Sequence, residues 1–165
     1  MVSVPIIGTL TTVRKTTGTA AENPLALEEQ VCFALAVASR SVIALYRPVL
    51  APLGLTHPQY LVMLALWEHG PVSVRGLSEM LQLDPGTLSP LLKRLETAGY
   101  VTRERNPNDE RALAVGLTPE GRALRRKALK VPPAIVERLG MNVAELKELQ
   151  RRLAQVIEAA TRPPA

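Results

Sequence analysis

Cys32 carries the most reactive side chain of the 165-residue sequence, and it is the chain's one cysteine. The thiolate is the species that attacks peroxides, and an ordinary thiol of pKa ~8.5 is only a few per cent thiolate at neutral pH. A lone cysteine in an apolar run such as "EEQVCFALAVASR" is more often a packing residue. A sensing role therefore requires a site that favours the anion.

Oxidation of Cys32 would first give a sulfenic acid. No second cysteine is present to resolve it. The product must then be a mixed disulfide with a low-molecular-weight thiol, a cyclic sulfenamide, or an over-oxidised acid.

Composition indicates a mainly helical protein, and its basic charge favours polyanions as partners but does not by itself decide the matter. Apolar residues make up 47% of the chain and aromatic residues only 3%, and the net charge is +5. No secretion signal is recognisable, and apolar runs such as "YLVMLALW" fall short of the ~20 residues that cross a bilayer. We expect a cytoplasmic protein that does not enter a membrane. No metal cluster, phosphate loop or Ser/His/Asp set is seen, so no cofactor or metal is expected.

The elements that must position these residues follow from periodicity and capping signals. Residues 1–23 have no helical period and are expected to be a flexible tail. Apolar residues at three- and four-residue spacing predict a first helix from Pro24, which Pro48 and Pro52 end. A second helix lies between the capping-box pair Thr56/Gln59 and Gly70. Thr118 caps a fifth helix, interrupted at Pro132-Pro133, and Asn142 caps the last.

Two short helices followed by a β-hairpin predict a winged helix-turn-helix. Ser73 caps residues 74–81, and Asp84 caps a helix that runs to Gly99. Beyond Gly99 the apolar period becomes two, and "NPND" forms the turn of a two-stranded hairpin. The expected fold class is mainly α with a small β-hairpin wing.

The fourth helix and the hairpin present the candidate DNA contacts. Leu88, Leu91, Leu92 and Leu95 share one helix face, which leaves small residues and cations on the other. Small residues let the backbone approach bases, and cations bind phosphates. Arginines of the hairpin can reach phosphates or the minor groove. The candidates are Gly86, Thr87, Ser89, Pro90, Lys93, Arg94, Arg103, Arg105 and Arg111. Pro90 lies past the first turn, so either the helix begins at Ser89 or its distortion shapes the surface.

These segments resemble a known family. "HPQYLVMLALWEHG", "LDPGTLSPLLKRLETAGYVTRERNPNDERALAVGLTPEGRAL" and the "DER" at 109–111 resemble the MarR family of dimeric bacterial repressors. With "EEQVCFALAVASR" and "YRPVL", the chain is most similar to the organic-hydroperoxide-sensing OhrR branch of the one-cysteine type, over about residues 25–160. The resemblance implies a dimerisation helix at 24–53, a winged helix-turn-helix at 54–118 and C-terminal dimerisation helices at 119–165.

The resemblance also implies that Cys32 is the redox-sensing residue, surrounded by tyrosine hydroxyls. Tyr46 occupies one tyrosine position, whereas Ala36 and His57 replace the other two. Fourteen residues of helix separate Tyr46 from Cys32 by ~21 Å, so contact must come from the other subunit of the dimer. A protonated His57 would stabilise the thiolate by charge, and reactivity would then fall as pH rises.

The expected function is a repressor that binds an inverted-repeat operator as a homodimer and releases it when organic hydroperoxide oxidises Cys32. Three alternatives remain open. A small aromatic ligand could release the DNA instead, the chain could be a thiol peroxidase, or it could coat DNA without sequence preference.

Overall fold

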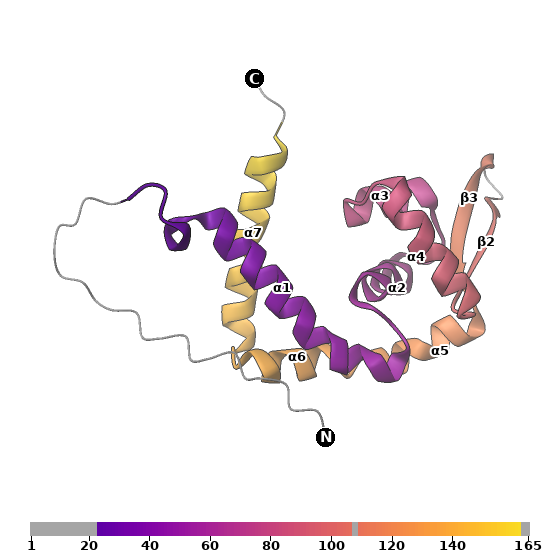
Figure 1. The fold of residues 1–165 in the computed structure, drawn as a ribbon. Coiled ribbons are helices and arrows are strands. Elements are labelled where there is room, and N and C mark those ends of the chain that lie inside the picture. Colours follow the sequence, from indigo (N-terminus) through magenta and orange to yellow (C-terminus); the bar gives the residue numbers. More distant parts are fainter. Residues whose placement is uncertain (1–22, 107–108, 163–165) are drawn as a thin grey trace. The chain divides into compact units, whose positions relative to one another are not determined.

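The computed structural model describes residues 23–106 and 109–162, with the side chains of 105–113 excluded. The chain divides into two compact units, Met1–Ala36 and Val37–Ala165. The described part of the first unit holds a 3₁₀ turn, η1 (Leu27–Glu29), and the first residues of helix α1 (Val31–Leu50). The rest of α1 and the other described elements belong to the second unit. Figure 1 labels the helices and strands along the chain.

Helix α1 begins later than the sequence indicated, and it ends at Leu50, between the two prolines that were expected to end it. Residues 24–30 form turns instead of α-helix, and the Gln30 side-chain amide donates to the Pro24 carbonyl at 2.8 Å. Pro48 lies inside α1, and a second 3₁₀ turn, η2 (Ala51–Leu53), contains Pro52. Gly54 follows with φ +67°, the left-handed conformation that closes the segment.

Helix α2 (His57–His69) has the predicted ends. The Thr56 backbone N–H donates to the Gln59 side chain at 2.8 Å, which forms a capping box, and Gly70 ends the helix. Six of its thirteen residues are buried. This helix is the centre of the second unit's core.

A tight turn joins α3 (Val74–Leu81) to α4 (Pro85–Thr97), as predicted. The Ser73 hydroxyl accepts from the Gly76 N–H at 3.0 Å, and Asp84 accepts from the Thr87 N–H at 2.9 Å. Gln82 turns the chain between them with φ +51°. The helix-turn-helix is thus confirmed.

The sheet has three strands where the sequence predicted two. Strands β2 (Val101–Asn106) and β3 (Asp109–Leu117) form the predicted antiparallel hairpin. A third strand, β1 (Val72–Ser73), pairs with Val115 and Ala114 on the free side of β3, so the order is β1-β3-β2. Two residues are too short a run to show a strand period. The predicted turn at 106–109 includes residues 107–108, which lie outside the described residues.

Three helices complete the chain: α5 (Pro119–Ala128), α6 (Val131–Leu139) and α7 (Val143–Thr161). The interruption predicted at Pro132-Pro133 was misplaced. Both prolines occupy the first turn of α6, where a missing N–H costs nothing, and the break falls at residues 129–130. Asn142 and Glu145 form the predicted capping box of α7.

The core is built mainly from leucines of the winged-helix elements. Leu66 of α2, Leu77 of α3, Leu92 and Leu95 of α4, and Val115 of β3 are at most 1% exposed. Such close packing fixes α4 against the sheet and against α2 (Figure 1). The candidate DNA-binding surface therefore stands on a rigid support.

Helices α1 and α7 carry little of this core. Leu50 is the one buried residue of α1, and none of α7 is buried. In α7 the apolar residues Val143, Leu149, Leu153, Val156 and Ile157 are exposed by 36–57%. Apolar helix faces of this kind require a further apolar surface.

By length and composition, Val31–Leu53 could also cross a membrane, with a mean hydropathy of 1.4. The sequence prediction considered only shorter apolar runs and did not detect this segment. It contains Arg40 and Arg47, and an arginine is costly at the centre of a bilayer.

Candidate functional site

Helix α4 presents a polar surface opposite its buried leucines. Leu88, Leu91, Leu92 and Leu95 are all buried, as predicted. The residues predicted to meet DNA from this helix are all exposed: Gly86, Thr87, Ser89, Pro90, Lys93 and Arg94. One ammonium group and one guanidinium group thus follow a front edge of small side chains.

Two hydroxyls at the front of α4 are engaged locally. The Thr87 hydroxyl donates to Asp84 at 2.6 Å, and the Ser89 hydroxyl donates to the Pro85 carbonyl at 2.7 Å. The Thr87 hydroxyl and N–H lower the pKa of Asp84. Each hydroxyl oxygen retains lone pairs that can accept from a base or a water.

Pro90 lies inside α4, which begins at Pro85. The possibility that the helix begins at Ser89 is therefore wrong. A proline five residues after the start cannot donate to the carbonyl four residues earlier, which is that of Gly86. Gly86 itself is exposed, so water has access to this part of the helix.

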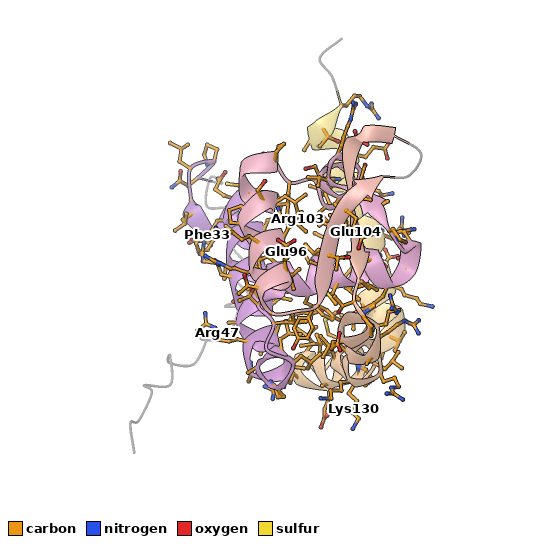
Figure 2. The ribbon with its side chains drawn as sticks, turned by 90° about the vertical axis from the view of Figure 1, so that its right-hand side faces the viewer. Phe33, Arg47, Glu96, Arg103, Glu104 and Lys130 are labelled. Carbon is orange, nitrogen blue, oxygen red and sulfur yellow. The ribbon has the colours of Figure 1, made fainter. Side chains whose placement is uncertain are left out.

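The wing contributes one arginine whose side chain is described. Arg103 of β2 donates from Nε to Glu96 Oε2 of α4 at 3.1 Å, and its Nη2 donates to the same oxygen. This pairing lowers the pKa of Glu96 and raises that of Arg103. Figure 2 shows the two residues side by side. Arg105 and Arg111 lie on β2 and β3, and their side chains are outside the described residues.

The predicted sensor residues fall in different units. Cys32 is the second residue of α1, and its side chain is exposed in the single chain. Tyr46 and His57 belong to the second unit and pack edge to face with ring centroids 4.9 Å apart. Tyr60 lies next to Tyr46 at 6.1 Å. The geometry makes Tyr46 and His57 one aromatic cluster.

Burial sets the protonation of this cluster. It raises the pKa of Tyr46 and lowers that of His57 below the usual 6.5. His57 is therefore mostly neutral at pH 7, which weakens the expectation that a protonated imidazole stabilises the thiolate. A neutral imidazole can still donate one hydrogen bond.

A cavity of about 390 Å³ that the sequence did not reveal opens beside α2, α5 and α6. Tyr60, Trp67, Leu64 and Leu129 give it an apolar lining, to which Arg125 adds a cation and Glu68 an anion. The Trp67 indole N–H donates to the Gly121 carbonyl at 2.9 Å and so holds the ring in place. This volume and the aromatic walls suit a small aromatic molecule, whereas the Glu68 carboxylate opposes the charge of an acid. The residues the structure describes contain no cluster of three metal-ligating side chains.

Comparisons with known proteins identify the class to which this fold and surface belong. The MarR family matches residues 55–113. The organic hydroperoxide resistance transcriptional regulator of Bacillus subtilis is 42% identical over 132 residues, which cover 80% of this chain and 90% of that protein. The chain belongs to the MarR family of transcriptional regulators.

Two solved structures are informative neighbours. Overoxidized AbfR bound to DNA, a protein of Staphylococcus epidermidis, has a TM-score of 0.65 and 35% identity, covering 81% of this chain and 94% of AbfR. Bordetella bronchiseptica BpsR, whose DNA binding is regulated by 6-hydroxynicotinic acid, has a TM-score of 0.74 and 26% identity, covering 82% and 98%. The curated relatives are regulators, so the thiol-peroxidase alternative is not supported.

Proposed function

We propose that the chain is a redox-responsive repressor that binds an inverted-repeat operator as a homodimer and releases it when organic hydroperoxide oxidises Cys32. The main support is the position of Cys32, which is exposed at the start of α1 in the single chain. The chain that carries it is 42% identical to an organic hydroperoxide resistance regulator. In the single chain the sulfur is uncovered, and in the proposed dimer residues of the second copy would approach it. A DNA-binding regulator works beside the chromosome, so a cytoplasmic location is part of the proposal.

The oxidation is a simple displacement. The Cys32 thiolate attacks one peroxide oxygen, the O–O bond breaks, and the alcohol leaves after taking up a proton. The sulfur becomes a sulfenic acid. Further reaction with a low-molecular-weight thiol would release water and leave a mixed disulfide. Each product is larger or more polar than the thiol.

The exposed apolar faces support a homodimer. Helices α1 and α7 leave large apolar side chains exposed in the single chain, and a second copy offers the matching surface. If the α1 helices cross antiparallel, Tyr46 and His57 of one subunit approach Cys32 of the other. Growth of the Cys32 side chain would then shift two α4 helices that must match major grooves ~34 Å apart.

The DNA contacts are assigned to α4 and the wing. Gly86, Thr87, Ser89 and Pro90 would meet base edges, and Lys93 and Arg94 would bind phosphates. Arg105 and Arg111 of the wing would contact the backbone or the minor groove. The exposed position of the α4 residues supports this assignment.

The test compares wild-type and Cys32→Ser protein by gel shift on the DNA upstream of its own operon, with and without cumene hydroperoxide. Both proteins should bind the operator DNA before peroxide is added. Peroxide should then release only the wild-type protein from the DNA. Scrambled DNA of equal length is the control. Peroxide release of Cys32→Ser would remove Cys32 from the mechanism.

The cavity supports a second candidate function, release by a small aromatic acid. Its size and aromatic walls suit a ring, and Arg125 would pair with a carboxylate against the opposing charge of Glu68. This function would be favoured over oxidation if such an acid released the Cys32→Ser protein from DNA and no longer released the Arg125→Gln protein.

A further inference from the structure

Arg103 lies on the inner face of the wing. Side chains alternate along a strand, so Arg103 shares its face with Val101, which is 2% exposed and belongs to the core. Thr102 and Glu104 occupy the opposite face. The cross-strand partner of Arg103 is Val115, which is fully buried. The guanidinium therefore starts from the side of β2 that packs on α4.

The guanidinium ends on a carboxylate of α4. Two of its nitrogens donate to the same Glu96 oxygen, and the side chains of Arg103 and Glu96 are only 30% and 38% exposed. Glu96 lies one residue before the end of α4. The pair thus connects the last turn of the DNA-facing helix to the third residue of the wing (Figure 2).

We propose that Arg103 is a positioning residue, which fixes the angle between the wing and α4 through Glu96, and is not a phosphate contact. The inference rests on the proposed DNA binding by α4 and the wing. A phosphate competing for Arg103 would have to displace a carboxylate that already occupies two of its donors. Holding the wing instead keeps Arg105 and Arg111, further along the strands, at a constant distance from α4.

The two roles of Arg103 predict opposite effects of the replacement Glu96→Gln on DNA affinity. If Arg103 bound a phosphate, Glu96 would compete with the DNA, and Glu96→Gln would tighten binding. If the pair positions the wing, Glu96→Gln and Arg103→Gln must weaken binding alike. Partly exposed ion pairs of this kind correspond to about a two- to fivefold change in Kd.

The experiment measures Kd on the upstream DNA as a function of salt for reduced full-length protein. The variants are Glu96→Gln, Arg103→Gln, their double, and the exchange Glu96→Arg/Arg103→Glu. Glu104→Gln, on the opposite face of β2, is the matched control. We expect both single variants to lose a similar amount of DNA affinity, and the double variant to lose no more than either. The exchange variant should recover affinity, and the dependence of Kd on salt concentration should not change.

A lower salt slope in Arg103→Gln, by about one, combined with tighter binding in Glu96→Gln, would overturn the proposal. Amide hydrogen exchange of the free protein supplies a second readout: both single variants should speed exchange in 101–106 and 109–117, and unchanged exchange in Glu96→Gln would contradict the inference. No peroxide is used. A failure of Cys32 as the sensor would therefore leave these results intact.

Discussion

The replacement Gly121→Ala is expected to destabilise the fold strongly, because no space exists for a methyl group there. A Cβ at this position would lie 2.0 Å from the carbonyl oxygen of Tyr100, whereas ordinary contacts begin at 3.4 Å. The backbones of α5 and of the segment before β2 would have to separate by about 1.4 Å, the difference between these distances. That segment connects α4 to the wing.

The cost has two parts. Forcing a methyl group into a packed site typically costs ~1–3 kcal/mol. Movement of Gly121 would also strain the hydrogen bond from the Trp67 indole to its carbonyl, which contributes about 1 kcal/mol. We expect a loss of ~2–4 kcal/mol, a large share of the ~5–15 kcal/mol that stabilises a domain.

Urea unfolding followed by circular dichroism, at one fixed protein concentration, measures this loss. Gly116→Ala is the matched control, because its nearest neighbours are the Thr102 hydroxyl at 3.7 Å and the Pro71 ring at 4.0 Å. The control should unfold within ~0.5 kcal/mol of the wild type. Equal unfolding midpoints for Gly121→Ala and Gly116→Ala would refute the reasoning.

Three further predictions follow from the site and the helix faces. Burial lowers the pKa of His57, so on acidification His57 takes up its proton more readily in the unfolded chain than in the folded one. The free energy of unfolding should therefore fall as the pH drops below about 6.5. In urea titrations at pH 5–7.5, His57→Gln should reduce this dependence of stability on pH. Lys93→Ala and Arg94→Ala should each lower the salt dependence of DNA binding by an amount that corresponds to about one phosphate contact. Fluorescence anisotropy on operator and scrambled DNA measures this dependence. An unchanged salt dependence would place these two side chains away from phosphates. Leu153→Glu, on the exposed face of α7, should convert the proposed homodimer to monomers in analytical ultracentrifugation, whereas a persistent dimer would remove α7 from the interface.

Local signals in the sequence located most of the helices because caps and turns are short-range features. Thr56, Ser73, Asp84 and Asn142 all begin helices as predicted. Pro132 was misread because proline both ends helices and suits their first turn. Strand β1 was missed because two residues pair only through the tertiary fold.

The candidate site was only partly predictable. The leucine period of α4 correctly placed Lys93 and Arg94 on the exposed face. The strand period also contained the information that Arg103 shares a face with Val101, but its meeting with Glu96 depends on how β2 packs against α4. The proposed sensor site would need a second subunit, and the sequence of one chain does not give the distance between Cys32 of one copy and Tyr46 of another.

The most direct test of the central claim counts oxidised sulfurs against released DNA. Wild-type protein on fluorescent operator DNA would be titrated with cumene hydroperoxide, with anisotropy recorded alongside intact mass. The mechanism predicts that anisotropy falls in proportion to Cys32 oxidation and is complete at about one oxidised sulfur per subunit. Fully oxidised Cys32 on DNA that remains bound, or release with the thiol intact, would contradict it.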